Sequence, residues 1–166
     1  MHQFYQDFVI RDWQKSDRDS AASVIRQVLT EYGLPWQPET ADQDVIAVES
    51  AYLETGGEFW VVEAKNQKIV GTAAYYPISK GNQAVEIRKM YLLPEVRGKG
   101  LGKYLLQQLE TVIKNRGFRE IWLETASVLA EAVCLYEKHG YKPVTEVETT
   151  RCDLAYIKKL AKITQY

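Results

Sequence analysis

Glycines and basic residues alternate over residues 96–103, the glycine-rich segment, which reads VRGKGLGK. Arg97, Lys99 and Lys103 supply positive charge, and an apolar pattern with helical spacing follows directly. The first turn of a helix has unpaired backbone N–H groups and a partial positive charge, and glycines let the backbone approach a ligand closely. The segment therefore predicts a site for an anion such as a pyrophosphate. The alternative is a polar turn that joins a strand to a helix and binds nothing.

Two familiar phosphate-binding motifs do not fit this segment. A P-loop would place a glycine at position 97, which is Arg97, and a serine or threonine after Lys103, where the chain has Tyr104. A dinucleotide-binding fingerprint counted from Gly98 or from Gly100 lacks its last glycine. The predicted anion site is therefore neither a P-loop nor a Rossmann site.

The composition is typical of a globular protein. The chain has 166 residues, of which 46% are hydrophobic and 26% are charged, with a net charge of −1. We expect one domain over residues 1–166, and the charge argues against nucleic acid or an anionic membrane as a partner. No signal peptide or membrane-spanning run is apparent. Cys134 and Cys152 have no CxxC spacing, so we expect a reduced, cytoplasmic protein in which Cys134 is a small core residue.

Hydrophobic periodicity predicts the elements that would position the glycine-rich segment. Strands are expected over residues 8–13, 59–64, 69–78, 85–92, 119–125, 141–144 and 149–157. Helices are expected between Ser16 and Gly33, over residues 44–53, from the glycine-rich segment to Gly117, and between Ser127 and Gly140. This order predicts a mixed α/β fold whose central strand–helix–strand unit is parallel and right-handed.

Three segments resemble motifs of the GNAT N-acetyltransferase superfamily, in the family's order. RGKGLG, residues 97–102, resembles the R/QxxGxG/A motif, and the preceding EIRKMYLLPEV resembles the strand before it. AEAVCLYEKHGYKP, residues 130–143, resembles the Axx(L)Y(E)KxGF/Y segment. The matches cover about residues 85–143, and the other predicted elements fit the family's fold. Many members have an asparagine where this chain has Leu129, so no cofactor contact is expected from that side chain.

The resemblance implies the GNAT fold, which is a mixed, mostly antiparallel sheet with a central parallel β-α-β unit that binds acetyl-CoA, flanked by helices. Acetyl-CoA would be the acyl donor, without a metal. Its pyrophosphate would lie on the backbone amides of Arg97, Gly98, Lys99, Gly100, Leu101, Gly102 and Lys103. Its pantetheine arm would pair with the strand over residues 85–92, where a bulge separates that strand from its parallel neighbour. Backbone groups at Met90, Tyr91 and Leu92 would hold the arm.

The chemistry that the resemblance implies is direct acetyl transfer to an amine in a ternary complex. Tyr136 matches the family tyrosine that protonates the leaving thiolate; otherwise it is a core tyrosine. Glu86 is the first candidate for the base that removes the amine's proton, since it lies on the strand beside the thioester. Glu124 on the opposing strand is the second, and a water chain is a third; either glutamate could instead be a surface or salt-bridged carboxylate. His139 is weaker, because it precedes a glycine that ends a helix.

The resemblance implies that the acceptor pocket lies among the first two helices, their connection and the hairpin strands. The aromatic and acidic residues of these regions are Tyr32, Trp36, Trp60, Tyr75, Tyr76, Glu39, Asp42 and Asp44. Such walls would suit a cationic amine of a small molecule or a peptide. Alternatively, Trp60, Tyr75 and Tyr76 pack the sheet, and the acidic residues are a solvated helix start.

The predicted function is that of an acetyl-CoA-dependent N-acetyltransferase. A non-catalytic acyl-CoA-binding module of the same fold is the alternative, and the match at Tyr136 favours the enzyme. A nucleic-acid-binding domain is disfavoured, because no aromatic residues alternate with the basic residues of the glycine-rich segment. The sequence leaves open the acceptor's identity and whether the chain is a monomer or a homodimer.

Overall fold

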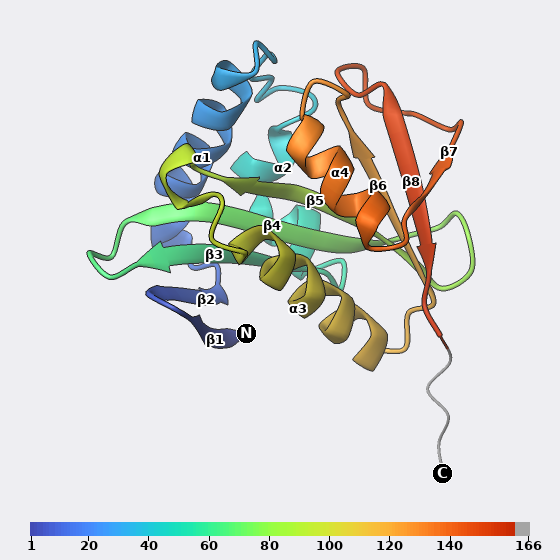
Figure 1. Ribbon diagram of the computed structural model, residues 1–166, viewed down its shortest axis with the longest axis horizontal. Helices are drawn as coiled ribbons and strands as arrows, with labels where there is room; N and C mark the ends of the chain where they lie inside the picture. The colour runs from blue at the N-terminus through green and yellow to red at the C-terminus, as the bar shows by residue number, and fades with distance from the viewer. Residues whose placement is uncertain (162–166) are drawn as a thin grey trace.

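The computed structural model describes residues 1–161, and its eight strands form one sheet in the order β1-β2-β3-β4-β5-β6-β8-β7 (Figure 1). The strands are β1 (His2–Tyr5), β2 (Phe8–Asp12), β3 (Glu58–Ala64), β4 (Ile69–Ile78), β5 (Ala84–Leu92), β6 (Glu120–Thr125), β7 (Lys142–Val144) and β8 (Leu154–Lys159). Within the described residues, β5 and β6 are the one parallel pair, and the other neighbours are antiparallel. The mixed, mostly antiparallel α/β fold expected from the sequence is confirmed.

Helices cover both faces of this sheet. They are α1 (Arg18–Glu31), α2 (Gln43–Ile46), α3 (Leu101–Asn115) and α4 (Ala130–Lys138). In Figure 1, α3 and α4 lie in front of the sheet, and α1 and α2 lie behind it. Leu105, Leu109 and Ile113 recur at helical spacing on α3 and are fully buried, so burial of this face holds α3 on the sheet. Gly100 precedes α3 and Gly117 follows it, with φ angles of 76° and 89° that favour glycine.

A bulge interrupts β5 where it pairs with β4. Ala74 pairs with Arg88, but Thr72 pairs with Tyr91, so β5 contains one residue more than β4 over this stretch. Lys89 lies in the bulge with a φ of 51°. The hydroxyl of Thr72 donates to the carbonyl of Lys89 at 2.7 Å and fixes this conformation.

The two parallel strands separate beyond the bulge. β5 pairs with β6 only over residues Ala84 to Ile87, opposite Glu120 to Leu123. Residues 88–92 of β5 have no strand partner on that side among the described residues. The bulge and the separation both agree with the expectation for this strand, and the backbone edge of β5 faces the space between β5 and β6.

The helix expected over residues 44–53 is divided into two short pieces. α2 ends at Ile46, and a π-helical turn covers Glu49–Leu53. Arg18 of α1 explains the division, because its guanidinium donates to the carbonyl of Ile46 and, at 2.6 Å, to the carboxylate of Glu49. A tertiary contact therefore competes with the continuous helical ladder.

The strands near both edges of the sheet also differ from the prediction. The strand expected from residue 149 begins at Leu154, because the backbone N–H groups of Glu148 and Thr149 donate to Glu124 at 2.6 and 2.8 Å. At the other edge, β1 is an additional strand that pairs with β2 in a hairpin. This hairpin brings the N-terminal residues toward the glycine-rich segment.

The last helix begins later than expected. α4 starts at Ala130 because the hydroxyl of Ser127 donates to Asp153 at 2.6 Å instead of capping a helix. Cys134, expected in the core, is exposed on α4. Gly140 ends the helical region with a φ of 83°, as predicted.

Candidate active site

A cavity of about 350 Å³ opens where β5 and β6 separate. Residues of α1, α3 and α4 close it, together with the loop that precedes β8. Ten of the predicted site residues line it, namely Glu86, Met90, Tyr91, Leu92, Arg97, Gly98, Gly100, Gly102, Lys103 and Tyr136. The fold therefore brings together, in one cavity, groups that are spread over residues 86–136.

The glycine-rich segment forms one end of this cavity. Gly98 and Gly100 have φ angles of 74° and 76°, which side chains other than glycine rarely adopt. A Cβ atom added at Gly102 would lie 3.6 Å from Leu92 and 3.8 Å from Leu135, both lining residues. The start of a 15-residue helix thus meets the cavity with bare backbone, which suits a phosphate group.

The three cations of this segment lie in different environments. Arg97 lines the cavity, but its guanidinium donates to both carboxylate oxygens of Glu31, at 2.7 and 2.8 Å. Lys99 does not line the cavity, because its ammonium lies over the ring of Phe8, 5.8 Å from the ring centroid. Lys103 lines the cavity and has no ion pair among residues 1–161. The positive charge expected from all three therefore comes mainly from Lys103 and the helix start.

Leu101 is the other predicted residue that the cavity excludes. Its side chain is 1% exposed and belongs to the hydrophobic core. Its backbone continues the segment into α3, so a contribution of Leu101 to ligand binding would be through its amide alone.

The β1–β2 hairpin supports the glycine-rich segment from outside the cavity. The hydroxyl of Tyr5 donates to the carbonyl of Lys99 at 2.9 Å, and the amide of Gln6 donates to the same carbonyl at 3.3 Å. The ring of Tyr5 stacks on Tyr104, with 4.4 Å between centroids. Nothing local in the sequence indicates this support, because the partners lie more than 90 positions apart.

Tyr136 lies on α4 and lines the cavity. It is 6% exposed, and its ring packs against Tyr141 with 5.7 Å between centroids. Within the described residues, its hydroxyl has no hydrogen-bond partner. Burial, with Tyr91 and Cys152 nearby, raises the pKa of Tyr136 above its ordinary value. The phenol is therefore protonated at neutral pH and can donate to a ligand in the cavity.

Glu86 lies on β5 just before the strands separate. The hydroxyl of Tyr76 on β4 donates to its carboxylate at 3.0 Å, and Arg88 donates in turn to that hydroxyl at 3.4 Å. Burial raises the pKa of the Glu86 carboxyl above its ordinary value, although Arg88 and Tyr76 act in the opposite direction. A carboxylate with a raised pKa in a cavity is suited to accept a proton.

The other two candidates for a base have structural partners. Both oxygens of Glu124 accept backbone N–H groups, from Glu148 and Thr149, so this carboxylate holds the loop before β8. His139 lies 2.7 Å from the carbonyl of Leu135 through Nδ1 and does not line the cavity. The geometry favours Glu86 over both.

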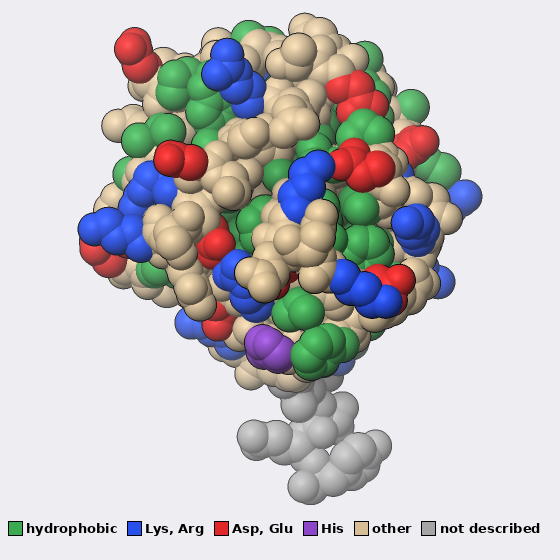
Figure 2. Space-filling view, turned by 90° about the vertical axis from the view of Figure 1, so that its left-hand side faces the viewer, with side chains coloured by type: hydrophobic (Ala, Val, Ile, Leu, Met, Phe, Trp, Pro, Cys, Tyr) green, Lys and Arg blue, Asp and Glu red, His purple; other side chains and the backbone are tan. Residues whose placement is uncertain are grey.

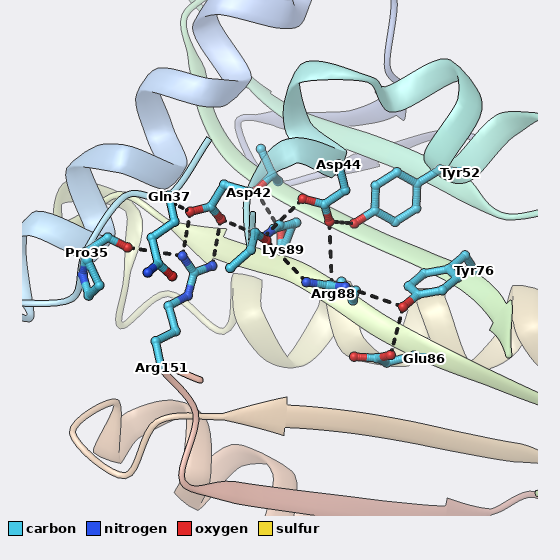
Figure 3. Close-up of polar contacts among 12 residues, drawn as sticks. Pro35, Gln37, Asp42, Asp44, Tyr52, Tyr76, Glu86, Arg88, Lys89 and Arg151 are labelled. Atoms are coloured by element: carbon cyan, nitrogen blue, oxygen red, sulfur yellow. Dashed lines mark hydrogen bonds and ion pairs between the residues drawn. The ribbon is translucent and has the colours of Figure 1, made fainter. Parts of the chain in front are cut away.

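A buried charge cluster lies beside the cavity, and Figure 3 shows Lys89 between Asp42 and Asp44, with Arg151 and Arg88 on the outer sides of these two carboxylates. Asp42 is fully buried and binds the ammonium of Lys89 at 2.7 Å and the guanidinium of Arg151 at 2.7 Å. Asp44 lies 3.3 Å from Lys89 and 3.6 Å from Arg88 and accepts a hydrogen bond from Tyr52. These contacts join the segment after α1 to β5 and to the loop before β8.

This cluster corrects the prediction of an acidic wall for a cationic amine. Asp42 and Asp44 are neutralised by cations of the protein itself, and Glu39 is exposed and does not line the cavity. Trp60 and Tyr75 are fully buried in the sheet, as the alternative reading held. Tyr32 lines the cavity, and Tyr76 reaches it through Glu86.

Asp42→Asn is expected to lower the free energy of unfolding by about 3–5 kcal/mol, because the change leaves buried cations uncompensated. Burial alone would raise the pKa of Asp42, but Arg151 and Lys89 outweigh it and lower the pKa from 3.8 to about 2. The stabilisation is therefore present above pH 3.8 and is lost as the pH falls toward 2. Urea titrations of both proteins between these pH values measure the effect.

Asp7→Asn is the matched control for this prediction. Asp7 pairs with Lys65 at 2.7 Å, but both side chains are largely exposed. Its loss should change the unfolding free energy little. Equal effects of the two substitutions, or a difference that does not shrink in acid, would contradict a stabilising role for the buried cluster.

Two further properties of residues 1–161 bear on the kind of site. No group of three or more His, Cys, Asp or Glu side chains there could hold a metal ion. None of the helices in this part of the chain combines the length and apolar character needed to span a membrane.

The sequence and the fold both have known relatives. The model of the acetyltransferase (GNAT) family matches residues 22–141. An uncharacterized N-acetyltransferase of Escherichia coli (strain K12), YjgM, is 35% identical over 142 residues, which are 84% of each chain. The crystal structure of a GNAT-family acetyltransferase from Staphylococcus aureus Mu50 has a TM-score of 0.85 and 20% identity, covering 93% of this chain and 99% of that chain. A spermidine N-acetyltransferase from Vibrio cholerae, in complex with CoA and spermine, has a TM-score of 0.68 and 17% identity over 93% and 96%.

The mixed sheet with its flanking helices matches the fold of the GNAT structure, and the family model together with relatives named N-acetyltransferases identifies an acyltransferase. The chain belongs to the acetyltransferase (GNAT) family, because the family's model matches more than half of its residues. The family resemblance carried by the glycine-rich segment and by the segment around Tyr136 is thereby confirmed.

Proposed function

We propose that this protein transfers an acetyl group from acetyl-CoA to an amine of a small molecule or a peptide, by direct attack in a ternary complex. One observation carries the proposal: a single cavity has a helix start with exposed backbone, suited to a phosphate group, at one end and has Glu86 and Tyr136 in its walls. An acyl donor and an amine could meet there beside a base and an acid.

The residues present fit acetyl-CoA. The cradle at Gly98, Gly100 and Gly102 leaves backbone exposed to a pyrophosphate, and Lys103 adds a full positive charge. The free edge of β5 around Met90 can pair with an extended pantetheine chain as a strand would. The bound CoA of the Vibrio cholerae enzyme is compatible with such an assignment in this fold.

Acetyl-CoA supplies an acetyl group activated as a thioester. Glu86 accepts a proton from the substrate ammonium, so the amine gains the lone pair that forms the new C–N bond. Tyr136 donates its hydroxyl proton to the sulfur as the C–S bond breaks. The ammonium loses two protons in all: one replaces the proton given by Tyr136, and the other leaves to solvent from Glu86. The products are the N-acetylated amine, CoA with a free thiol, and one proton.

The non-catalytic alternative makes a different prediction for the same cavity. A module that only binds acyl-CoA needs the glycine-rich segment but has no use for a buried, protonated tyrosine without a partner. A nucleic-acid interface gains no support from the face in Figure 2, where basic and acidic side chains are interspersed. The enzyme is therefore the function that the geometry supports best.

An acceptor screen tests the proposed function. Purified protein is incubated with acetyl-CoA and a panel of amines, amino acids and peptides, and free thiol is measured. Thiol release that depends on an amine is expected. Binding of acetyl-CoA without release for any amine in the panel would favour the non-catalytic module.

Acetyl-CoA is expected to raise the melting temperature, with a stabilisation of about 2.7 kcal/mol when its concentration is a hundredfold above Kd. Gly102→Val should remove most of this shift, because its methyl groups would extend into the cavity beside Leu92 and Leu135. Thermal melts with and without acetyl-CoA measure both effects.

Gly102→Ala is the matched control for Gly102→Val. Its Cβ atom would make ordinary contacts of 3.6 and 3.8 Å, so the shift should remain. Substitution of Gly100 is a poorer test, because a Cβ atom there would lie 2.7 Å from the Tyr5 hydroxyl and strain a φ of 76°. An unchanged melt of the parent, or equal shifts for the Val and Ala variants, would contradict the assigned site.

A further inference from the structure

We propose that the acceptor carries a carboxylate close to its amine, as a free amino acid does, and that Arg88 binds this carboxylate. The inference rests on the proposed function and specifies its substrate class. It starts from a second cavity, of about 280 Å³, next to the first. The residues that line the second cavity are Thr40, Ala41, Asp44, Arg88, Glu148, Thr149 and Thr150.

Arg88 lies between the two cavities. It lines both of them, and Thr149 is the one other residue that does so among the described residues. Glu86 precedes Arg88 by two positions on β5 and lines the first cavity. An acceptor that enters through the second cavity would therefore pass Arg88 before its amine reaches Glu86.

The guanidinium of Arg88 is held loosely by the protein. Its Nε lies 3.6 Å from Asp44, its Nη1 lies 3.4 Å from the hydroxyl of Tyr76, and its Nη2 lies 3.3 Å from the carbonyl of Ala41. Charged hydrogen bonds of this kind are usually about 2.7–2.9 Å long. Lys89 and Arg151, in the same cluster, reach 2.7 Å. Arg88 thus retains donor capacity, and its side chain is 23% exposed.

The charge balance of the cluster also favours an added anion. Arg88, Lys89 and Arg151 are three cations in ionic contact with two carboxylates, Asp42 and Asp44. The third carboxylate nearby, Glu86, reaches Arg88 only through the hydroxyl of Tyr76, so one positive charge in excess has no carboxylate in direct contact. Glu148 at the rim of the second cavity is paired with Lys80 at 3.1 Å, so it does not remove this excess. A carboxylate on the acceptor would supply the missing charge.

The spacing between Glu86, which would meet the amine, and Arg88, which would meet the carboxylate, sets the distance between these two groups in the acceptor. Glu86 and Arg88 are two residues apart on one face of β5, a separation of about 6–7 Å along the strand. Their side chains converge on the hydroxyl of Tyr76, with contacts of 3.0 and 3.4 Å (Figure 3). The amine and the carboxylate must therefore lie within a few bonds of each other, which selects an amino acid over a polyamine or a long peptide.

The test uses pairs of acceptors that differ only in the carboxylate: amino acids and their primary amides. The parent protein should acetylate the acids with a kcat/KM about 10- to 100-fold higher than the amides, as expected for a paired charged hydrogen bond. Arg88→Gln should remove this preference, because kcat/KM should fall about 10- to 100-fold more for the acids than for the amides. Arg88→Lys keeps the positive charge but lacks the planar, paired N–H donors of a guanidinium, so it should retain part of the preference for acids.

Arg116→Gln is the matched control, because Arg116 forms a similar Arg–Tyr–Glu arrangement outside both cavities. It donates to the hydroxyl of Tyr75 at 2.7 Å and to Glu58 at 3.0 Å. This variant should keep the preference for acids. If the melting temperature of Arg88→Gln is far below that of the parent, its kinetics are not informative. The comparison of acids with amides on the parent protein then decides whether the acceptor's carboxylate is recognised.

The outcomes separate this inference from the proposed function. Acids and amides acetylated equally by the parent, or an Arg88→Gln loss that is the same for both, would overturn the carboxylate site while leaving the N-acetyltransferase intact. If none of the amines causes thiol release, that result would count against the proposed function. In that case, melts of the CoA-bound protein with acids and with amides still test the site, and equal shifts would overturn it.

Discussion

Tyr136→Phe is expected to lower kcat by about 10²–10⁴-fold, the usual contribution of a general acid. The change keeps the ring that packs against Tyr141 and removes only a hydroxyl that has no partner within the described residues. Stability should therefore change little. KM for acetyl-CoA should also change much less than kcat, because the hydroxyl contributes mainly as charge develops on sulfur. Steady-state kinetics with acetyl-CoA measure both constants.

Two comparisons sharpen this prediction. Tyr141→Phe removes a buried hydroxyl from the same aromatic cluster but outside the cavity, so its kcat should stay near that of the parent. An acetyl donor whose thiol is more acidic should reduce the loss seen in Tyr136→Phe, because that thiolate needs less help to leave. If chemistry limits the rate and Tyr136→Phe retains activity within threefold of the parent (roughly 0.7 kcal/mol), Tyr136 is a core residue and not the acid.

Glu86→Gln is expected to lower kcat/KM by about 10²–10⁴-fold near neutral pH and to change the shape of the pH profile. In the parent, Glu86 accepts the proton of the bound ammonium, so the rate should be nearly flat between the pKa of Glu86 and the pKa of the amine. Burial raises the first of these pKa values, so the acid limb of the parent should lie above the ordinary range of a glutamate. The variant depends on the free amine in solution, and its rate should rise steadily up to the amine's pKa. The two profiles should therefore differ most at low pH.

The stability of Glu86→Gln separates catalysis from folding. A raised carboxyl pKa means that the ionised group costs the folded state free energy at neutral pH, so the amide should not lower the melting temperature. Glu124→Gln serves as the comparison, because Glu124 holds two backbone N–H groups and should affect stability without changing the shape of the profile. Superimposable profiles for Glu86→Gln and the parent would rule out Glu86 as the base. A Glu124→Gln profile that rises steadily up to the amine's pKa would instead transfer the role to Glu124.

Local patterns in the sequence determined the elements and one end of the site. The apolar spacing of α3 and the glycines at 98, 100 and 102 act through residues that are near one another in the chain, so they predicted a helix start with bare backbone. Tyr136 and Glu86 were predicted from their places in motifs and strands, and both line the cavity. The parallel pair was expected from the helix between β5 and β6, whereas the position of β8 between β6 and β7 was not.

The tertiary structure alone decided which charges are free. The sequence presents Asp42 and Asp44 as an acidic run, but Lys89 and Arg151, 47 and 109 positions away, neutralise Asp42 once the chain is folded. Ion pairs depend on which residues the topology brings within a few ångströms, and this has no periodic trace in the sequence. Long-range contacts also decide the positions of two other cations. The ammonium of Lys99 lies over the ring of Phe8, and Arg18 divides the helix expected over residues 44–53. Arg88 was an ordinary strand residue in the sequence, and only the fold places it between two cavities.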